Sequence, residues 1–167
     1  MKQIVADTGP LLHLHEAQAL HLLPLIGSVS VPVRVITELR KHAPHAFSAT
    51  LPAWLNVAPL SPAAQQRATA WQQSALLHSG EAETLALAAE SRPDWFLTDD
   101  AAARLMAESM SMEAHGSLGV VLWCAAQHLI PKAAAESSLT NLENSSLWLS
   151  PRVRAEARMA LTKLFAA

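Results

Sequence analysis

A short apolar run near the start of the chain, residues 4–6, stops at an acidic residue, Asp7. The run is too short and too uniformly apolar for an amphipathic helix, so it predicts a strand buried on both faces of a parallel sheet. Gly9 and Pro10 end this strand, and Pro10 followed by two leucines favours a helix start. We therefore expect Asp7 at the carboxyl end of a central strand, the edge where open α/β sheets bind their ligands.

Beyond this segment, short apolar runs alternate with longer runs that suit helices. The strands expected after the first cover residues 29–31, 54–57 and 95–98, with an edge strand at 112–114. The expected helices cover residues 11–26 (one or two helices closed by Gly27), 32–42, 63–77, 80–90, 101–110, 117–128, 131–142 and 151–164. This alternation predicts the α/β class, with a parallel sheet covered by helices on both faces.

Composition predicts a single domain with a large core. The 167 residues are 51% hydrophobic and 16% charged, and the net charge of −2 gives no overall basic field for nucleic acid. No apolar stretch reaches about 18 residues, and no signal-peptide pattern opens the chain, so we expect a cytoplasmic protein without a membrane segment. The one cysteine, Cys124, lies in an apolar run and is expected to be a buried thiol.

Carboxylates gather where the predicted elements end or begin. Two strands end at acids, Asp7 and the pair Asp99 and Asp100, and two helices add Glu38 and the pair Glu81 and Glu83. Carboxylates that converge on one cleft repel one another unless cations or protons neutralise them, and all-oxygen ligands suit Mg²⁺ or Mn²⁺. Such an ion activates water and neutralises charge on a phosphodiester during hydrolysis.

Five segments in this order resemble the PIN-domain nucleases. They are residues 4–12, 35–39, 80–88, 96–100 and 116–120. The similarity is greatest to the VapC-like branch with the Gly-Glu-x-Glu motif, which includes many toxins of toxin–antitoxin pairs. It implies a Rossmann-like three-layer α/β/α sandwich with a mainly parallel five-stranded sheet. The domain would span residues 1–167, with a core at about 2–130 and C-terminal helices at about 131–165.

The resemblance also implies an activity and a set of site residues. The activity is cleavage of RNA that depends on Mg²⁺ or Mn²⁺. Asp7 matches the first acidic motif, Glu38 the second, Glu81 the third, and Asp99 or Asp100 the fourth; we prefer Asp99. The expected metal ligands are therefore Asp7, Glu38, Glu81, Glu83, Asp99 and Asp100, with Thr8 and Ser117 as accessory residues.

Several of these residues also fit purely structural roles. Asp7 suits a turn or cap, Glu38 a solvated helix face, and Ser117 a helix cap. With Gly80 as N-cap, Glu83 falls at the third helical position, where a glutamate reaches back to the cap, so we assign Glu81 to the metal. One of Asp99 and Asp100 is expected to cap the next helix, and Asp100 is spaced for an ion pair with Arg104. His13 and His15 are expected to be ordinary helix residues.

Partners follow from resemblance and composition. RNA contacts are expected at Arg40, Lys41 and Arg104, with Arg34 nearby, while the basic last helix (Arg152, Arg154, Arg158 and Lys163) suits RNA, a partner or solvent. The scattered tryptophans give no visible stacking platform. A homodimer through residues 11–26 and an antitoxin protein are the expected protein partners, because the leucine-rich run has more apolar residues than one helix face needs.

Two other classes of function fit the same carboxylates. One is a non-catalytic metal- or RNA-binding regulatory protein. The other is a phosphatase with Asp7 as nucleophile, although such enzymes usually carry a second aspartate where this chain has Gly9.

Overall fold

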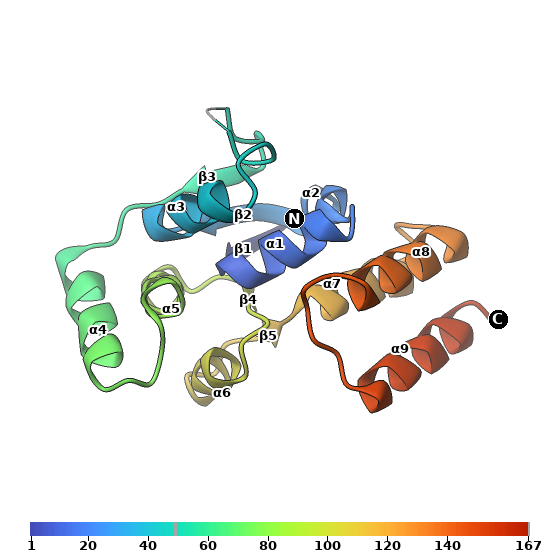
Figure 1. Ribbon diagram of the computed structural model, residues 1–167. Coiled ribbons are helices and arrows are strands. Elements are labelled where there is room, and N and C mark those ends of the chain that lie inside the picture. Colours follow the sequence, from blue (N-terminus) through green and yellow to red (C-terminus); the bar gives the residue numbers. More distant parts are fainter. Residues whose placement is uncertain (49, 167) are drawn as a thin grey trace.

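A five-stranded sheet forms the centre of the computed structural model, which describes residues 1–48 and 50–166 (Figure 1). The strand order is β3-β2-β1-β4-β5, and every neighbouring pair is parallel. The strands are β1 (Lys2–Ala6), β2 (Gly27–Val31), β3 (Leu55–Val57), β4 (Trp95–Leu97) and β5 (Ala114–His115). The predicted parallel sheet is confirmed, and β1, which precedes Asp7, is its central strand.

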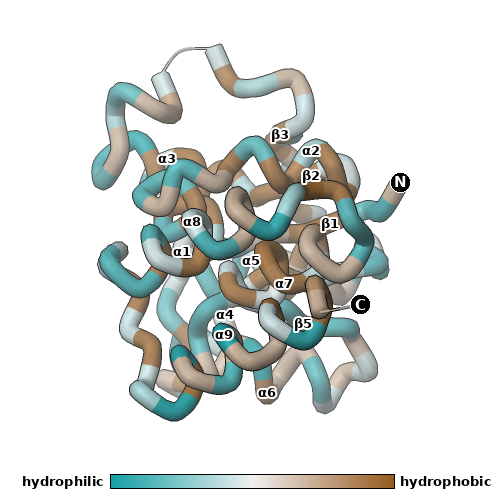
Figure 2. Tube along the Cα trace, turned by 90° about the vertical axis from the view of Figure 1, so that its right-hand side faces the viewer, coloured by the Kyte–Doolittle hydropathy of each residue, from teal (hydrophilic) through white to brown (hydrophobic). Residues whose placement is uncertain are grey.

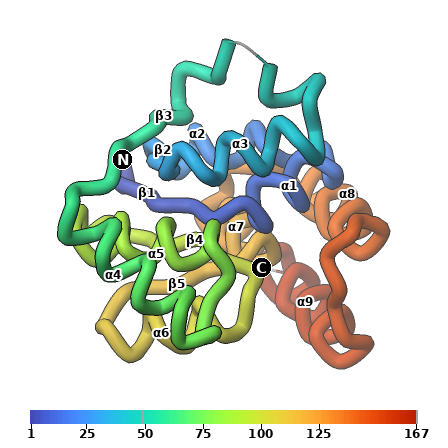
Figure 3. The backbone as a smooth tube through the Cα atoms, turned by 60° about the vertical axis from the view of Figure 1, so that its left-hand side comes forward, coloured from blue at the N-terminus to red at the C-terminus, as the bar shows by residue number. Residues whose placement is uncertain are grey.

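Helices cover both faces of the sheet, as Figures 1 and 3 show. They are α1 (Thr8–Glu16), the short 3-10 helix η1 (Leu20–Leu22), α2 (Leu23–Ile26), α3 (Val33–His42), α4 (Pro62–Gln73), α5 (Ser79–Ser91), α6 (Ala101–Ser109), α7 (Ser117–Ala126), α8 (Lys132–Glu143) and α9 (Pro151–Leu164). No helix in the described residues is long and apolar enough to cross a membrane.

Alternate residues of the strands supply two separate cores. Ile4 and Ala6 pack into one cluster, which includes residues of α1, α3, α7, α8 and α9, whereas Val5 packs into the other, with α4, α5 and α6. Trp95 and Phe96 divide between the same two clusters. This is the two-residue period of a strand whose faces are both buried. In Figure 2, brown hydrophobic segments gather at the centre of the molecule, around α5 and α7. The three-layer sandwich is therefore confirmed.

The segment after β1 differs in detail from expectation. Helix α1 begins at Thr8, with Asp7 as its N-cap, rather than near Pro10. Gly27 closes α2 as its C-cap, as predicted, and is at the same time the first residue of β2. A Cβ at Gly27 would lie 1.9 Å from the carbonyl oxygen of Lys2, so only glycine lets β2 approach β1 here. The edge strand also lies later than predicted, at Ala114–His115.

The apolar run at residues 11–26, where we predict a dimer interface, is mostly buried in the core. Leu22 and Ile26 are buried, as are Leu11, Leu14 and Leu23, which leaves less exposed apolar surface there than the leucine content indicates. The homodimer itself stays a prediction. Only Leu25 of this apolar run is substantially exposed. The two short helices η1 and α2 turn the chain, so the leucines face the core from several directions rather than from one helix stripe. Cys124 is buried as expected, and burial raises the pKa of its thiol to about 11.

Candidate active site

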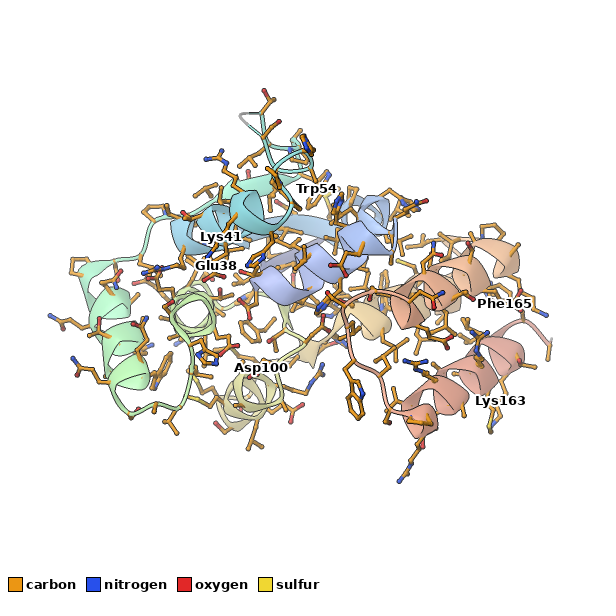
Figure 4. The ribbon with its side chains drawn as sticks, viewed as in Figure 1. Glu38, Lys41, Trp54, Asp100, Lys163 and Phe165 are labelled. Carbon is orange, nitrogen blue, oxygen red and sulfur yellow. The ribbon has the colours of Figure 1, made fainter. Side chains whose placement is uncertain are left out.

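One acid-lined cavity, of about 480 Å³, lies at the carboxyl ends of the central strands. Asp7 follows β1, and Asp99 and Asp100 follow β4, its hydrogen-bonded neighbour. Figure 4 shows Glu38 on α3 and Asp100 at the start of α6, with the end of α5 between them. The lining residues are Asp7, Thr8, Gly9, His13, Glu38, His78, Gly80, Glu81, Asp99, Asp100, Leu147 and Trp148. Five of the six predicted acids thus share one cavity, and Glu83 does not line it.

Asp7 is the most deeply buried acid of this cavity. Its side chain accepts a hydrogen bond of 2.8 Å from the Thr8 amide, which is the cap role considered above. The pKa of Asp7 is raised to about 7, mainly by burial and also by the carboxylates of Glu81, Glu38 and Asp100, against the lowering effect of the Thr8 hydrogen bond. The buried carboxylate therefore lies in a field of like charge that a cation would neutralise.

Glu38 points into the cavity from α3 and is held there from two sides. The Thr8 hydroxyl donates a hydrogen bond to Glu38 Oε2. On the other side, a Cβ at Gly80 would lie 2.7 Å from Oε2 and 2.8 Å from Oε1 of Glu38. Glu38 therefore needs a glycine at the start of α5, and it is not the solvated helix residue considered as the alternative.

Of the two glutamates of α5, Glu81 has both the cavity position and the capping role, and Glu83 has neither. Helix α5 begins with His78 as N-cap, so Glu81 is the third helical residue and its Oε2 accepts a 2.9 Å hydrogen bond from the His78 amide. Glu81 closes the capping box and also lines the cavity. Glu83 lies instead beside Arg34, 3.6 Å from the Arg34 Nε. The prediction that Glu83 serves the helix end is wrong, because the N-cap of α5 is His78, two residues before Gly80.

One of Asp99 and Asp100 caps the next helix, as expected. Asp100 caps α6 through a 2.7 Å hydrogen bond from the Ala103 amide to its Oδ1. Asp99 accepts hydrogen bonds from the Ser117 amide on Oδ1 at 2.7 Å and from the Ser117 hydroxyl on Oδ2 at 2.6 Å. Ser117 is the first residue of α7, whose N-cap is Gly116, so it holds Asp99 at a helix N-terminus, a favourable place for a carboxylate.

His13 is a cavity residue that the sequence analysis missed. Its Nδ1 lies 2.6 Å from Asp99 Oδ2, and its side chain is 15% exposed. A signal was present in the sequence, because Gly9 and His13 are four residues apart and so share a face of α1 beside Asp7. Gly9 leaves space there, since a Cβ on it would lie 3.7 Å both from His13 Cε1 and from Asp99 Cβ. Leu147 and Trp148 also line the cavity, although no motif in the sequence marks them as site residues.

The predicted RNA-binding cations lie outside this cavity. Arg40 donates to the carbonyl oxygens of Phe47 and Ser48, which ties it to the loop after α3, and Lys41 is exposed on the same helix (Figure 4). The Arg104 guanidinium donates to the carbonyl oxygens of Thr98 and Ala114, each at 3.2 Å. The expected ion pair between Arg104 and Asp100 is absent from the described residues.

Part of the basic surface of α9 is neutralised by acids of the same chain. Arg158 pairs with Glu143 of α8, and Arg152 pairs with Glu156 one turn along α9. Neither arginine lines the acidic cavity. These pairs leave α9 less basic than its sequence suggests.

The donor set of the cavity suits a divalent cation in its chemistry. The lining acids supply only oxygen donors, which Mg²⁺ and Mn²⁺ prefer, and their mutual repulsion around Asp7 would be relieved by an ion. Across residues 1–48 and 50–166, no three acidic, histidine or cysteine side chains are close enough to ligate one ion in their present positions. The acidic side chains of the cavity would therefore have to rotate toward one another to bind a cation.

A family model described as a PIN domain matches residues 3–163. The chain belongs to the PIN-domain family. PIN domains are generally nucleases, so the acidic cavity of this PIN domain is the candidate active site of a hydrolase. No curated protein matches the chain. The resemblance to PIN domains is confirmed, whereas membership of the VapC-like branch stays a prediction.

Proposed function

We propose that this PIN domain is an endoribonuclease that cleaves RNA phosphodiester bonds with Mg²⁺ or Mn²⁺. The observation that carries the proposal is the position of Asp7. It is buried at the carboxyl end of the central strand, and Glu38, Glu81 and Asp100 raise its pKa. A protein rarely buries a carboxylate beside three others without a function that needs their combined charge.

The cavity residues have two roles: some would hold the cation, and others orient the acidic side chains. Asp7, Glu38, Glu81 and one or both of Asp99 and Asp100 would hold the cation, which when bound supplies activation of water and neutralisation of phosphate charge. Around them, the chain itself fixes the acids. Thr8 orients Glu38 through its hydroxyl, and Ser117 and His13 orient Asp99. These second contacts matter because a ligand that is held in place binds a metal more tightly.

The direct test combines a nuclease assay with a phosphatase assay. Purified protein is incubated with single-stranded RNA and, separately, with a small phosphate ester, with Mg²⁺, Mn²⁺ or EDTA. We expect RNA cleavage that EDTA abolishes and no release of phosphate from the ester. Release of phosphate alone would favour the phosphatase, and binding of RNA without cleavage would favour a regulatory protein.

The proposal extends to the biological role by resemblance to VapC-like proteins. We propose a cytoplasmic toxin, present as a homodimer, that an antitoxin protein inhibits by covering the acidic cavity. Inducing the chain alone should arrest growth, and inducing it with Asp7→Asn should not. A neighbouring gene whose product restores growth and co-purifies with the chain would identify the antitoxin. Light scattering at micromolar concentration tests the dimer, and a strictly monomeric mass would contradict it.

A further inference from the structure

Trp148 is an exposed aromatic side chain at the rim of the acidic cavity. It is 79% exposed, whereas the other four tryptophans are buried or half-buried. Together with Leu147 it lines both the acidic cavity and a neighbouring cavity of about 370 Å³. An exposed indole is costly in water unless something covers it, so its place between two cavities indicates a ligand.

The segment that carries Trp148 is fixed on both sides. In Figure 1 this segment joins α8 to α9 and passes α7. On one side, the Ser146 amide and hydroxyl donate to the carboxylate of Glu16 at 2.7 to 2.9 Å. On the other, the Arg154 Nε donates to the Leu149 carbonyl at 3.0 Å. An anchored backbone presents the indole already ordered, which lowers the entropy cost of binding to it.

The neighbouring cavity has the composition of a site for a planar, mostly apolar group. It shares Asp99, Leu147 and Trp148 with the acidic cavity, so the two adjoin. Its other walls include the cation Arg104 and the apolar side chains of Leu118 and Leu122. A nucleotide joins a phosphate to a planar aromatic base. A phosphate held at the acids would therefore bring an attached base within reach of Trp148.

We propose that Trp148 stacks on an unpaired nucleobase next to the scissile phosphate of the RNA. This inference rests on the proposed ribonuclease function. A base must leave its helix to stack on a side chain, and every base has a π-face, so the site selects unpaired RNA rather than one sequence. No stacking platform is visible in the sequence, because most residues that line the cavities with Trp148 come from distant parts of the chain.

Fluorescence anisotropy with labelled oligoribonucleotides tests the stacking. Binding is measured in Mg²⁺ with chains that carry Asp7→Asn, so that cleavage does not consume the ligand. We expect Trp148→Ala to weaken binding of single-stranded RNA by about five- to one-hundredfold, and Trp148→Phe to retain most of the affinity. The matched control is Met159→Ala, which removes another exposed apolar side chain, on α9 and outside both cavities, and should leave binding unchanged.

Abasic oligonucleotides then identify the contact. If a base stacks on Trp148, removing the base at one position should weaken binding to the Trp148 chain, and Trp148→Ala should cause no further loss with that oligonucleotide. Equal affinities of the Trp148 and Trp148→Ala chains for intact RNA would overturn the inference. So would a fall in mass by light scattering with RNA affinity unchanged, because Trp148 would then contact a second copy of the chain.

Failure of this inference can be told apart from failure of the ribonuclease proposal. The chain with Asp7 intact is assayed for cleavage in parallel. RNA binding that depends on Trp148 without any cleavage counts against the nuclease alone. Cleavage that is unaffected by Trp148→Ala counts against the stacking alone. Because Trp148 is exposed, its variants should melt at the temperature of the parent, which checks that they are folded.

Discussion

Ser117 and Asp99 are joined by two hydrogen bonds that together fix the carboxylate. The Ser117 amide donates to Oδ1 at 2.7 Å and the Ser117 hydroxyl to Oδ2 at 2.6 Å. The backbone part of this contact belongs to the start of α7 and is kept by any substitution except proline, but the hydroxyl part depends on the side chain. In this pair, Asp99 is the residue that would contact the ion or substrate, and Ser117 is the residue that positions Asp99.

Ser117→Ala should remove the hydroxyl donor and leave Asp99 less firmly placed. Since outer contacts of metal ligands are worth roughly 10- to 100-fold, we expect Mn²⁺ affinity and cleavage to fall by about that factor. The lost hydrogen bond to a buried acceptor should lower the free energy of unfolding by about 1–3 kcal/mol. Isothermal titration and urea unfolding measure the two effects. Ser138→Ala, a buried serine on α8 outside the cavity, is the control and should keep full activity.

Asp7→Asn should abolish cleavage and stabilise the protein at neutral pH. In metal-free buffer the pKa of Asp7 is about 7 in the folded chain against 3.8 for the ordinary side chain. Between about pH 4 and 7 the folded state holds a proton that the unfolded state has released, so stability falls as pH rises through this window. The whole loss is on the order of a few kcal/mol.

The Asp7→Asn variant lacks this carboxyl group, so its free energy of unfolding should not show the fall between about pH 4 and 7 that Asp7 causes in the parent. Urea unfolding at pH 4, 6 and 8 compares them, and we expect the curves to coincide at the lowest pH and to separate at the highest. A parent whose stability rises from pH 4 to 8 relative to the variant would contradict the burial of a repelled carboxylate at this position.

Glu81→Gln and Glu81→Ala should give different phenotypes, because Glu81 has two roles. Glutamine still accepts the hydrogen bond from the His78 amide, so Glu81→Gln should weaken Mn²⁺ binding with little change in melting temperature. Glu81→Ala should in addition cost on the order of 1 kcal/mol of stability. Glu83→Gln loses only a partly exposed contact with Arg34 and should change neither by much. Weaker Mn²⁺ binding by Glu83→Gln than by Glu81→Gln would reverse the assignment.

Gly80→Ala should reduce activity by displacing Glu38 rather than by unfolding the chain. The new Cβ would lie 2.7 Å from Glu38 Oε2, so the flexible glutamate must move away, whereas alanine itself favours the helix by about 0.5–1 kcal/mol. We expect a large loss of cleavage with an unchanged melting temperature. In a chain that already carries Glu38→Ala, Gly80→Ala should cause no further loss. A second loss of similar size would place the effect of Gly80 elsewhere.

The sequence by itself determined the order of strands and helices along the chain and which acidic residues line the cavity, apart from Glu83. The apolar runs that stop at Asp7 and Asp99 are short and uniformly apolar, which predicts buried strands from the local sequence alone. Because parallel strands place their carboxyl ends at one edge, the meeting of these two acids followed from the pattern. The sequence pattern placed the N-cap of α5 at Gly80, whereas the N-cap is His78, two residues earlier. The capping role was therefore assigned to Glu83 instead of Glu81.

Only the tertiary structure decided which side chains surround those acids. His13 meets Asp99 across 86 positions of sequence, and Trp148 reaches the acidic cavity from the segment between α8 and α9. The leucines of residues 11–26 other than Leu25 are buried or half-buried because η1 and α2 turn the chain into the core, which their spacing did not reveal. Local sequence carries the periodicity of one element, but contacts between elements depend on packing angles and turns that the whole chain sets at once.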